Sequence, residues 1–202
     1  MVSVFDTRPC SLGEGPLWHP LRGELFWFDI NAHQLLSKTD MWQFDEFVSA
    51  AGWISQDELL IASESQLFRF QLGDHSQSKI CDLEADNPVT RSNDGRCDPQ
   101  GGFWIGTMGK KAEAKAGAIY RYYRGDLVQL FPEITIPNAI CFAPDGQTAY
   151  FTDTPLRQIL AVDLDADGWP CSAARVAVDL TVTAENPDGA VVDAQGNIWN
   201  AQ

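Results

Sequence analysis

Oxygen-bearing side chains stand in short polar clusters that separate strand-like runs of this sequence. The clusters cover residues 13–16, residues 91–95 and the Pro-led segments 137–138 and 187–189. Among them, Glu14, Asn138 and Asp188 offer two carboxylates and one amide carbonyl, which are hard donors that suit a divalent cation. A cation beside a pocket of sugar size would suit the hydrolysis of a small ester or lactone.

The runs between these clusters have the composition of short β-strands. They are rich in aromatic and β-branched residues and are broken by Gly, Asp and Pro, as in residues 24–28, 59–62, 102–106, 148–152 and 197–200. No long amphipathic helix is evident. We therefore predict an all-β chain.

A turn followed by a strand recurs along the chain. The turns cover residues 20–23, 98–101, 144–146 and 193–196, with residues 55–57 as a degenerate copy. Most steps between copies are about 45 residues, and a second strand that could form a hairpin follows several of them. Such a period in an all-β pattern indicates propeller blades, and a chain of 202 residues would then hold four to five of them. A β-sandwich with evenly spaced hairpins is the alternative.

The overall charge and the apolar runs limit the partners. The formal net charge is −14, which argues against nucleic acid and against anionic membrane surfaces. No apolar run approaches the length of about 18 residues that a membrane span needs. Residues 1–8 show no secretory signal. The composition leaves the oligomeric state open.

The five cysteines are scattered through the chain without a paired spacing: Cys10, Cys81, Cys97, Cys141 and Cys171. An odd number without a Cys-x-x-Cys pair argues against a disulfide framework and against a thiolate zinc site. Reduced cysteines favour the cytoplasm.

The polar clusters, taken in order, resemble the SMP-30/gluconolactonase family, which includes regucalcin and bacterial sugar lactonases. The resemblance rests on residues 11–18, on residues 91–95 with 98–99 and 106–108, and on Pro137-Asn138 and Pro187-Asp188-Gly189. It implies a six-bladed β-propeller with one divalent metal ion on its axis. It also implies that residues 1–202 form a single propeller domain, matching about the first two thirds of a family member, with the C-terminal blade or blades missing.

The resemblance also assigns roles to individual residues. It implies that Glu14, Asn138 and Asp188 bind the metal, with Ca²⁺ as the first choice and Zn²⁺, Mg²⁺ or Mn²⁺ as alternatives. It implies that Arg91 and Asn93 contact a sugar lactone. In this hypothesis Asp188 is also the general base toward water.

Two local patterns receive a purely structural interpretation. Asp94-Gly95 is read as a simple turn. Residues 163–168 copy the first half of an EF-hand loop, but Ala174 stands where a bidentate Glu is required, so we predict a hairpin turn.

The loop after Met108 departs from the family pattern. Animal members have an acidic residue there, whereas this chain has Gly109-Lys110-Lys111. We expect this loop to lie over the pocket mouth, so the substrate of the animal proteins does not carry over.

The sequence therefore predicts a metal-dependent lactonase that converts an aldonolactone to its aldonic acid. Two alternatives remain: a calcium-binding regulatory protein without catalysis, of the regucalcin type, and an inactive propeller fragment that serves as a binding scaffold.

Overall fold

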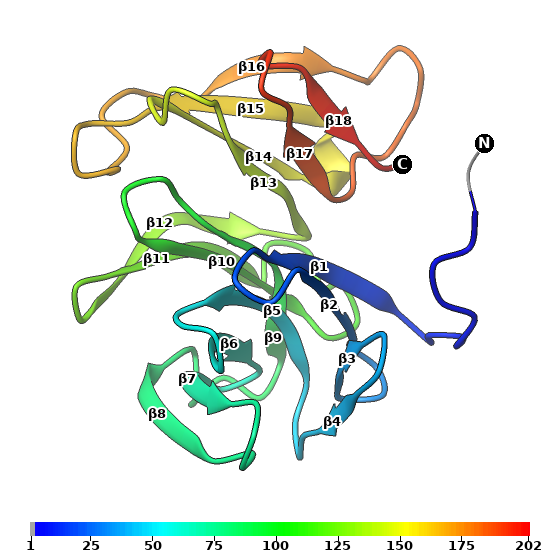
Figure 1. Cartoon of the computed structure of the whole chain (residues 1–202). Helices are drawn as coiled ribbons and strands as arrows, with labels where there is room; N and C mark the ends of the chain where they lie inside the picture. Colours follow the sequence, from blue (N-terminus) through cyan, green and yellow to red (C-terminus); the bar gives the residue numbers. More distant parts are fainter. Residues whose placement is uncertain (1–2) are drawn as a thin grey trace.

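Residues 3–202 are described by a computed structural model, in which antiparallel sheets follow one another around an axis in chain order (Figure 1). The first sheet, blade 1, contains β1 (Gly13–His19), β2 (Glu24–Asp29), β3 (Gln34–Ser37) and β4 (Met41–Gln43). Blade 2 contains β5 (Val48–Trp53), β6 (Glu58–Ser63), β7 (Gln66–Gln71) and β8 (Gln77–Asp82).

The later sheets repeat this arrangement. Blade 3 contains β9 (Thr90–Cys97), β10 (Phe103–Gly109), β11 (Gly117–Tyr123) and β12 (Asp126–Ile134). Blade 4 contains β13 (Pro137–Phe142), β14 (Thr148–Asp153), the 3₁₀ turn η1 (Thr154–Leu156), β15 (Gln158–Asp163) and β16 (Arg175–Asp179). Blade 5 is represented by β17 (Ala190–Val192) and β18 (Ile198–Asn200).

The all-β propeller predicted from the sequence is confirmed. The predicted turns at 20–23, 55–57, 98–101, 144–146 and 193–196 each join the first strand of a blade to its second strand. The segment at 163–168 is the predicted turn and lies between β15 and β16, where Asp165 Oδ1 accepts the backbone N–H groups of Asp167 and Trp169.

Apolar layers between the blades form the core. Phe26 and Phe28 of blade 1 pack against Phe68 and Phe70 of blade 2. The layer between blades 2 and 3 contains Leu60, Leu67, Phe103 and Ile105, and the layer between blades 3 and 4 contains Trp104, Ile119, Ile140 and Phe151. Ala139, Cys141 and Ala190 join blades 4 and 5. The alternating apolar residues of the strands thus face the neighbouring blades.

The turns that precede the second strands are held by a repeated carboxylate motif. Asp98 accepts hydrogen bonds from Gly102 N at 2.7 Å and from Trp104 Nε1 at 3.1 Å. Asp193 accepts the same two bonds from Asn197 N and Trp199 Nε1, both at 2.9 Å. The Asp-x-x-Gly turns in blades 3 and 5 therefore share one chemical construction.

Asp98 has an additional partner in blade 3. Its Oδ2 accepts a charged hydrogen bond from Arg121 Nε at 2.7 Å, and both side chains are fully buried. Arg121 also donates to Asp167 O of blade 4 at 2.7 Å, and its guanidinium lies 4.4 Å from the ring centroids of Tyr123 and Trp169. This buried pair joins the turn to the next blade.

Asp98→Asn is expected to lower the free energy of unfolding by about 3–5 kcal/mol, because it leaves the buried Arg121 charge without its partner. The new amide would also direct N–H groups toward two donors. Asp193→Asn is the matched control, since Trp199 is exposed and no cation is paired with Asp193 among residues 3–202. Urea unfolding of both variants tests this, and equal losses would contradict the assigned role of Arg121.

Candidate functional site

The first strand of each blade lies along the axis and is called an inner strand. The inner strands carry the polar clusters. β1, β5, β9, β13 and β17 contact one another in this order, and each pairs by backbone only with the second strand of its own blade. Asp94-Gly95 therefore lies within β9, and the turn expected there is wrong.

A β-bulge in β1 positions Glu14. Glu14 pairs with Phe28, and the register shifts before the next pair, Leu17 with Phe26. Gly15 has a φ of +58°, and a Cβ atom there would lie 2.2 Å from Ser49 O of β5. Only glycine fits this close approach, so the Glu-Gly pair holds Glu14 at the contact between blades 1 and 2.

The same local arrangement recurs at Asn138 in β13. Asn138 pairs with Thr152, the register shifts before Cys141, and Ala139 has a φ of +55°. Asp153 Oδ1 accepts the N–H groups of Thr135 and Ile136, which fixes the entry of the chain into β13. The bulge presents Asn138 from blade 4 as Glu14 is presented from blade 1.

Glu14, Asp94 and Asp188 line one cavity of about 740 Å³ between blade 1 and blade 5. Trp27 and Trp199 contribute apolar surface to the same cavity. A concave site with apolar walls and a few polar groups is typical of small-molecule binding sites.

The carboxylates in this cavity interact electrostatically. Burial, together with the charges of Asp188 and Asp94, raises the pKa of Glu14 to about 7, and Arg91 opposes this shift. Burial also raises the pKa of Asp94, against the hydrogen bond that its Oδ2 accepts from Ile140 N at 2.8 Å. Negative charge is thus concentrated where the sequence predicts a cation.

A continuous run of hydrogen bonds joins the other predicted site residues. Arg91 Nη1 donates to Asn93 Oδ1 at 2.9 Å, and Asn93 Nδ2 donates to Asn138 Oδ1 at 3.2 Å. Asn138 Nδ2 donates to Thr154 Oγ1 at 3.0 Å, and Thr154 Oγ1 donates to Pro187 O at 2.8 Å. The run connects β9, β13 and η1 with the residue before Asp188.

The five predicted site residues therefore divide into two connected groups. Glu14 and Asp188 share the cavity, whereas Arg91, Asn93 and Asn138 are linked by hydrogen bonds and do not line that cavity. Residues 3–202 contain no cluster of three His, Cys, Asp or Glu side chains arranged to hold a metal ion. The proposed ligand set contains only two carboxylates, and its third member is an amide.

Sequence reasoning missed three residues of this region. Thr154 had no signal, because its importance comes from a contact with another blade. Asp94 was interpreted as part of a turn. Arg96 Nε donates to Ile140 O at 2.9 Å and its Nη2 to Ala190 O at 3.2 Å, which joins three inner strands. Its place in the Arg-Ser-Asn-Asp-Gly-Arg run was the one available clue.

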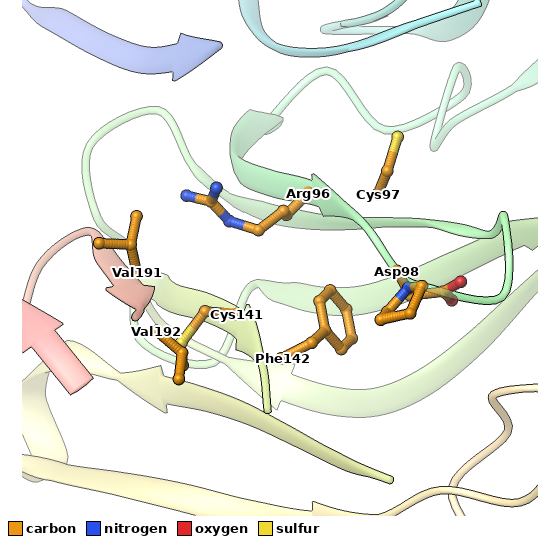
Figure 2. Close-up of a pocket in the computed structure, with 8 residues that line it drawn as sticks. Arg96, Cys97, Asp98, Cys141, Phe142, Val191 and Val192 are labelled. Atoms are coloured by element: carbon orange, nitrogen blue, oxygen red, sulfur yellow. The ribbon is translucent and has the colours of Figure 1, made fainter. Parts of the chain in front are cut away.

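A second cavity, of about 280 Å³, lies at the other end of these inner strands. Figure 2 shows Arg96 extending toward Val191, while Cys97, the next residue, points to the opposite side of β9. Cys141 and Phe142 of β13 complete much of the wall. Arg96 and Val191 line both cavities, so the two cavities adjoin at these residues.

The loop after β10 lies at the carboxylate end, because Met108 pairs with Arg91. Lys110 Nζ forms an ion pair with Glu64 of blade 2 and donates to Pro88 O at 3.0 Å. These bonds hold Lys110 against blade 2.

Comparison with known proteins identifies the family. The family model described as SMP-30/Gluconolactonase/LRE-like region matches residues 12–202. The chain belongs to this family. It is 41% identical, over 95% of its length and 67% of the relative's, to a protein of Rhizobium meliloti named putative sugar lactone lactonase. It is 34% identical to a protein of Azospirillum brasilense named L-arabinolactonase, over 98% of this chain and 69% of that protein.

A solved structure agrees with the fold. A calcium-binding protein of Agrobacterium tumefaciens, titled regucalcin, superposes with a TM-score of 0.94 and 42% sequence identity. The superposition covers 96% of this chain and 68% of that protein. No helix within residues 3–202 is long and apolar enough to cross a membrane.

Glu14→Gln is expected to stabilise the metal-free protein at pH 8. The raised pKa means that folded protein retains a proton that unfolded protein releases between about pH 4.5 and pH 7. The associated stability is therefore full below this window and is lost as the pH rises through 7. A gain of about 1–2 kcal/mol is expected, because one pKa unit is worth about 1.4 kcal/mol and water screens part of the effect at a half-buried group.

Urea unfolding in the presence of a chelator measures this gain, which should disappear near pH 4.5. Glu113 lies outside the cavity, and its backbone hydrogen bonds lower its pKa, so Glu113→Gln serves as a control that should not stabilise at pH 8. An equal gain for Glu14→Gln at both pH values would contradict the role of charge.

Proposed function

We propose that this chain hydrolyses a sugar lactone to the aldonic acid with the help of one divalent metal ion. The observation that carries the proposal is the cavity that Glu14 and Asp188 both line, in a member of a family whose relatives include proteins named sugar lactone lactonase and L-arabinolactonase. Lactone hydrolysis is the activity that these names support.

The metal is proposed to be held by Glu14, Asn138 and Asp188, with Ca²⁺ as the first choice and Zn²⁺, Mg²⁺ or Mn²⁺ as alternatives. The donor chemistry fits, because carboxylate and amide oxygens suit hard cations and the raised pKa of Glu14 marks a place where positive charge is needed. When bound, such an ion supplies a Lewis acid that polarises the lactone carbonyl.

Asp188 is proposed as the general base. Its backbone is fixed, because Asp188 N donates to Ala201 O at 3.0 Å and Asn200 Nδ2 donates to Asp188 O at 3.1 Å. The carboxylate would take a proton from water as the water oxygen bonds to the carbonyl carbon. The ring C–O bond then breaks, the ring oxygen takes a proton and becomes a hydroxyl group, and the carbonyl carbon becomes the carboxyl of the product.

Arg91 and Asn93 are proposed to orient the sugar. Within residues 3–202, the side-chain hydrogen bonds of Arg91 all come from Nη1, which donates to Ser92 O and Asn93 Oδ1. The guanidinium therefore retains N–H donors on Nε and Nη2 for the substrate. The amide group of Asn93 is already bonded at both ends, so its part is to hold Arg91 and Asn138 in place as well as to border the sugar.

The alternative is calcium binding without catalysis. It is favoured by the solved structure titled as a calcium-binding protein. Saturable calcium binding without hydrolysis across a panel of aldonolactones would select this alternative, and it would leave the bonds around Arg91 without a substrate to explain them.

We further infer that the chain forms one propeller domain and functions in the cytoplasm. The apolar layers join each blade to the next, as a single domain requires. All five cysteines are free, which is typical of a reducing compartment.

Asp188→Asn is expected to lower kcat for aldonolactone hydrolysis by at least about 10²-fold, because an amide cannot accept the proton of water. Calorimetric titration with Ca²⁺ should also show weaker binding. Asp193→Asn is the matched control, since it makes the same change in the same blade outside the cavity. Wild-type kcat in Asp188→Asn would refute the proposed base.

Arg91→Lys is expected to raise KM about tenfold while changing calcium affinity little. Lysine keeps the positive charge near Glu14 but loses the planar fork that can bond two oxygens. Steady-state kinetics and calcium titration on the same sample measure the two effects. A large loss of calcium affinity with an unchanged KM would move Arg91 from the substrate to the metal site.

A further inference from the structure

The Thr154 hydroxyl contacts one proposed metal ligand, Asn138, and the residue directly before another proposed ligand, Asp188. Its Oγ1 lies 3.0 Å from Asn138 Nδ2 and 2.8 Å from Pro187 O, the carbonyl directly before Asp188. These contacts bring together β13, η1 and the segment that leads into β17. No role was assigned to Thr154 from the sequence.

The chemistry of the partners fixes the direction of both hydrogen bonds. A hydroxyl has one proton, and the carbonyl of Pro187 can only accept, so the Thr154 proton goes to Pro187 O. The Thr154 oxygen must then accept from Asn138, and the amide can donate only through Nδ2. Asn138 Oδ1 is thereby turned away from Thr154.

The other end of the run agrees with this direction. Arg91 can only donate, so Asn93 must present Oδ1 to it. Asn93 Nδ2 then donates to Pro137 O and to Asn138 Oδ1. Asn138 Oδ1 therefore accepts one hydrogen bond, from Asn93 Nδ2, and its second lone pair remains for the proposed metal ion.

The backbone of Thr154 is held independently of its hydroxyl. Thr154 N donates to Ile136 O at 3.0 Å, and Thr154 is the first residue of the 3₁₀ turn η1, followed by Pro155. The side chain is consequently carried on a fixed point next to β13. Removal of the hydroxyl alone would free Asn138 Nδ2 and Pro187 O without removing the support of the backbone.

We propose that Thr154 is a positioning residue that directs Asn138 Oδ1 and the Asp188 segment toward the cation. This inference rests on the metal site of the proposed function. Groups that orient metal ligands through hydrogen bonds typically change metal affinity about 10–100-fold when they are removed.

The test compares three variants by calorimetric titration with Ca²⁺ alone. Thr154→Val keeps the shape but removes the hydroxyl, and it should weaken calcium binding at least about tenfold. Thr154→Ser restores the hydroxyl and should bind as wild type does. Thr107→Val is the matched control, because Thr107 is buried, its hydroxyl donates to Glu84 Oε1 at 2.9 Å, and it pairs with Ser92 and not with a proposed ligand. This variant should lower Tm and leave calcium affinity unchanged.

The side-chain amide of Asn138 supplies a second readout that needs neither metal nor activity. In metal-free protein labelled with ¹⁵N-asparagine, the Asn138 Nδ2 protons should exchange with water faster in Thr154→Val than in wild type or Thr154→Ser. Unchanged calcium affinity and unchanged exchange in a folded Thr154→Val protein would overturn the inference alone. Absence of calcium, magnesium, manganese and zinc binding by the wild type would overturn the proposed metal-dependent function, and the inference with it.

Discussion

The inner strands of neighbouring blades do not pair with one another through their backbones. The geometry of the candidate site therefore depends on side-chain hydrogen bonds between these strands. Each inner strand is paired only with the second strand of its own blade. Hydrogen bonds from side chains supply the lateral connections. Asn93 donates to Pro137 O, Arg96 donates to Ile140 O and Ala190 O, and Ser49 donates to Ser92 Oγ at 2.8 Å. A ring of blades thereby gains the angular precision that a site shared by several blades requires.

The β-bulges explain how one inner strand can carry a candidate site residue and also pack against the neighbouring blades. A regular strand would alternate its side chains strictly between its two faces. In β1 and β13, the shift after Glu14 and Asn138 changes the direction of the following residues, which return to the packed layers between the blades. Gly15 and Ala139 adopt the positive φ angles that accompany these shifts. The same short strand thus carries a proposed metal ligand and residues of the apolar core.

The second strands could be predicted from the sequence, whereas the first strands could not. Residues 24–28, 59–62 and 148–152 are aromatic and β-branched, and they form β2, β6 and β14 within the apolar layers. Asp94-Gly95 of β9, by contrast, was interpreted as a turn, although it lies within a strand along the axis. β-propensity describes a half-buried pleated surface with apolar packing, and the axis of this propeller is not such a surface.

The connections among the candidate site residues were also beyond sequence reasoning. The family resemblance pointed to Glu14, Asn138 and Asp188 one by one, since each lies in a short recognisable motif. The contacts of Thr154 and Arg96 join residues that are 16 to 94 positions apart, and no local spacing in the sequence encodes them. Such contacts follow from the blade geometry, which the repeat predicts only in outline.

The charged groups near the axis interact with one another and do not cancel completely. The carboxylates of Glu14, Asp94 and Asp188 face the cavity, and the guanidinium groups of Arg91 and Arg96 interact with them. If all five groups were ionised, one negative charge would remain without a partner in a half-buried place. A proton on Glu14 removes this excess in the metal-free protein, and its pKa is raised mainly by burial and further by the charges of Asp188 and Asp94. In the proposed function, a divalent cation would therefore compete with this proton for the Glu14 carboxylate.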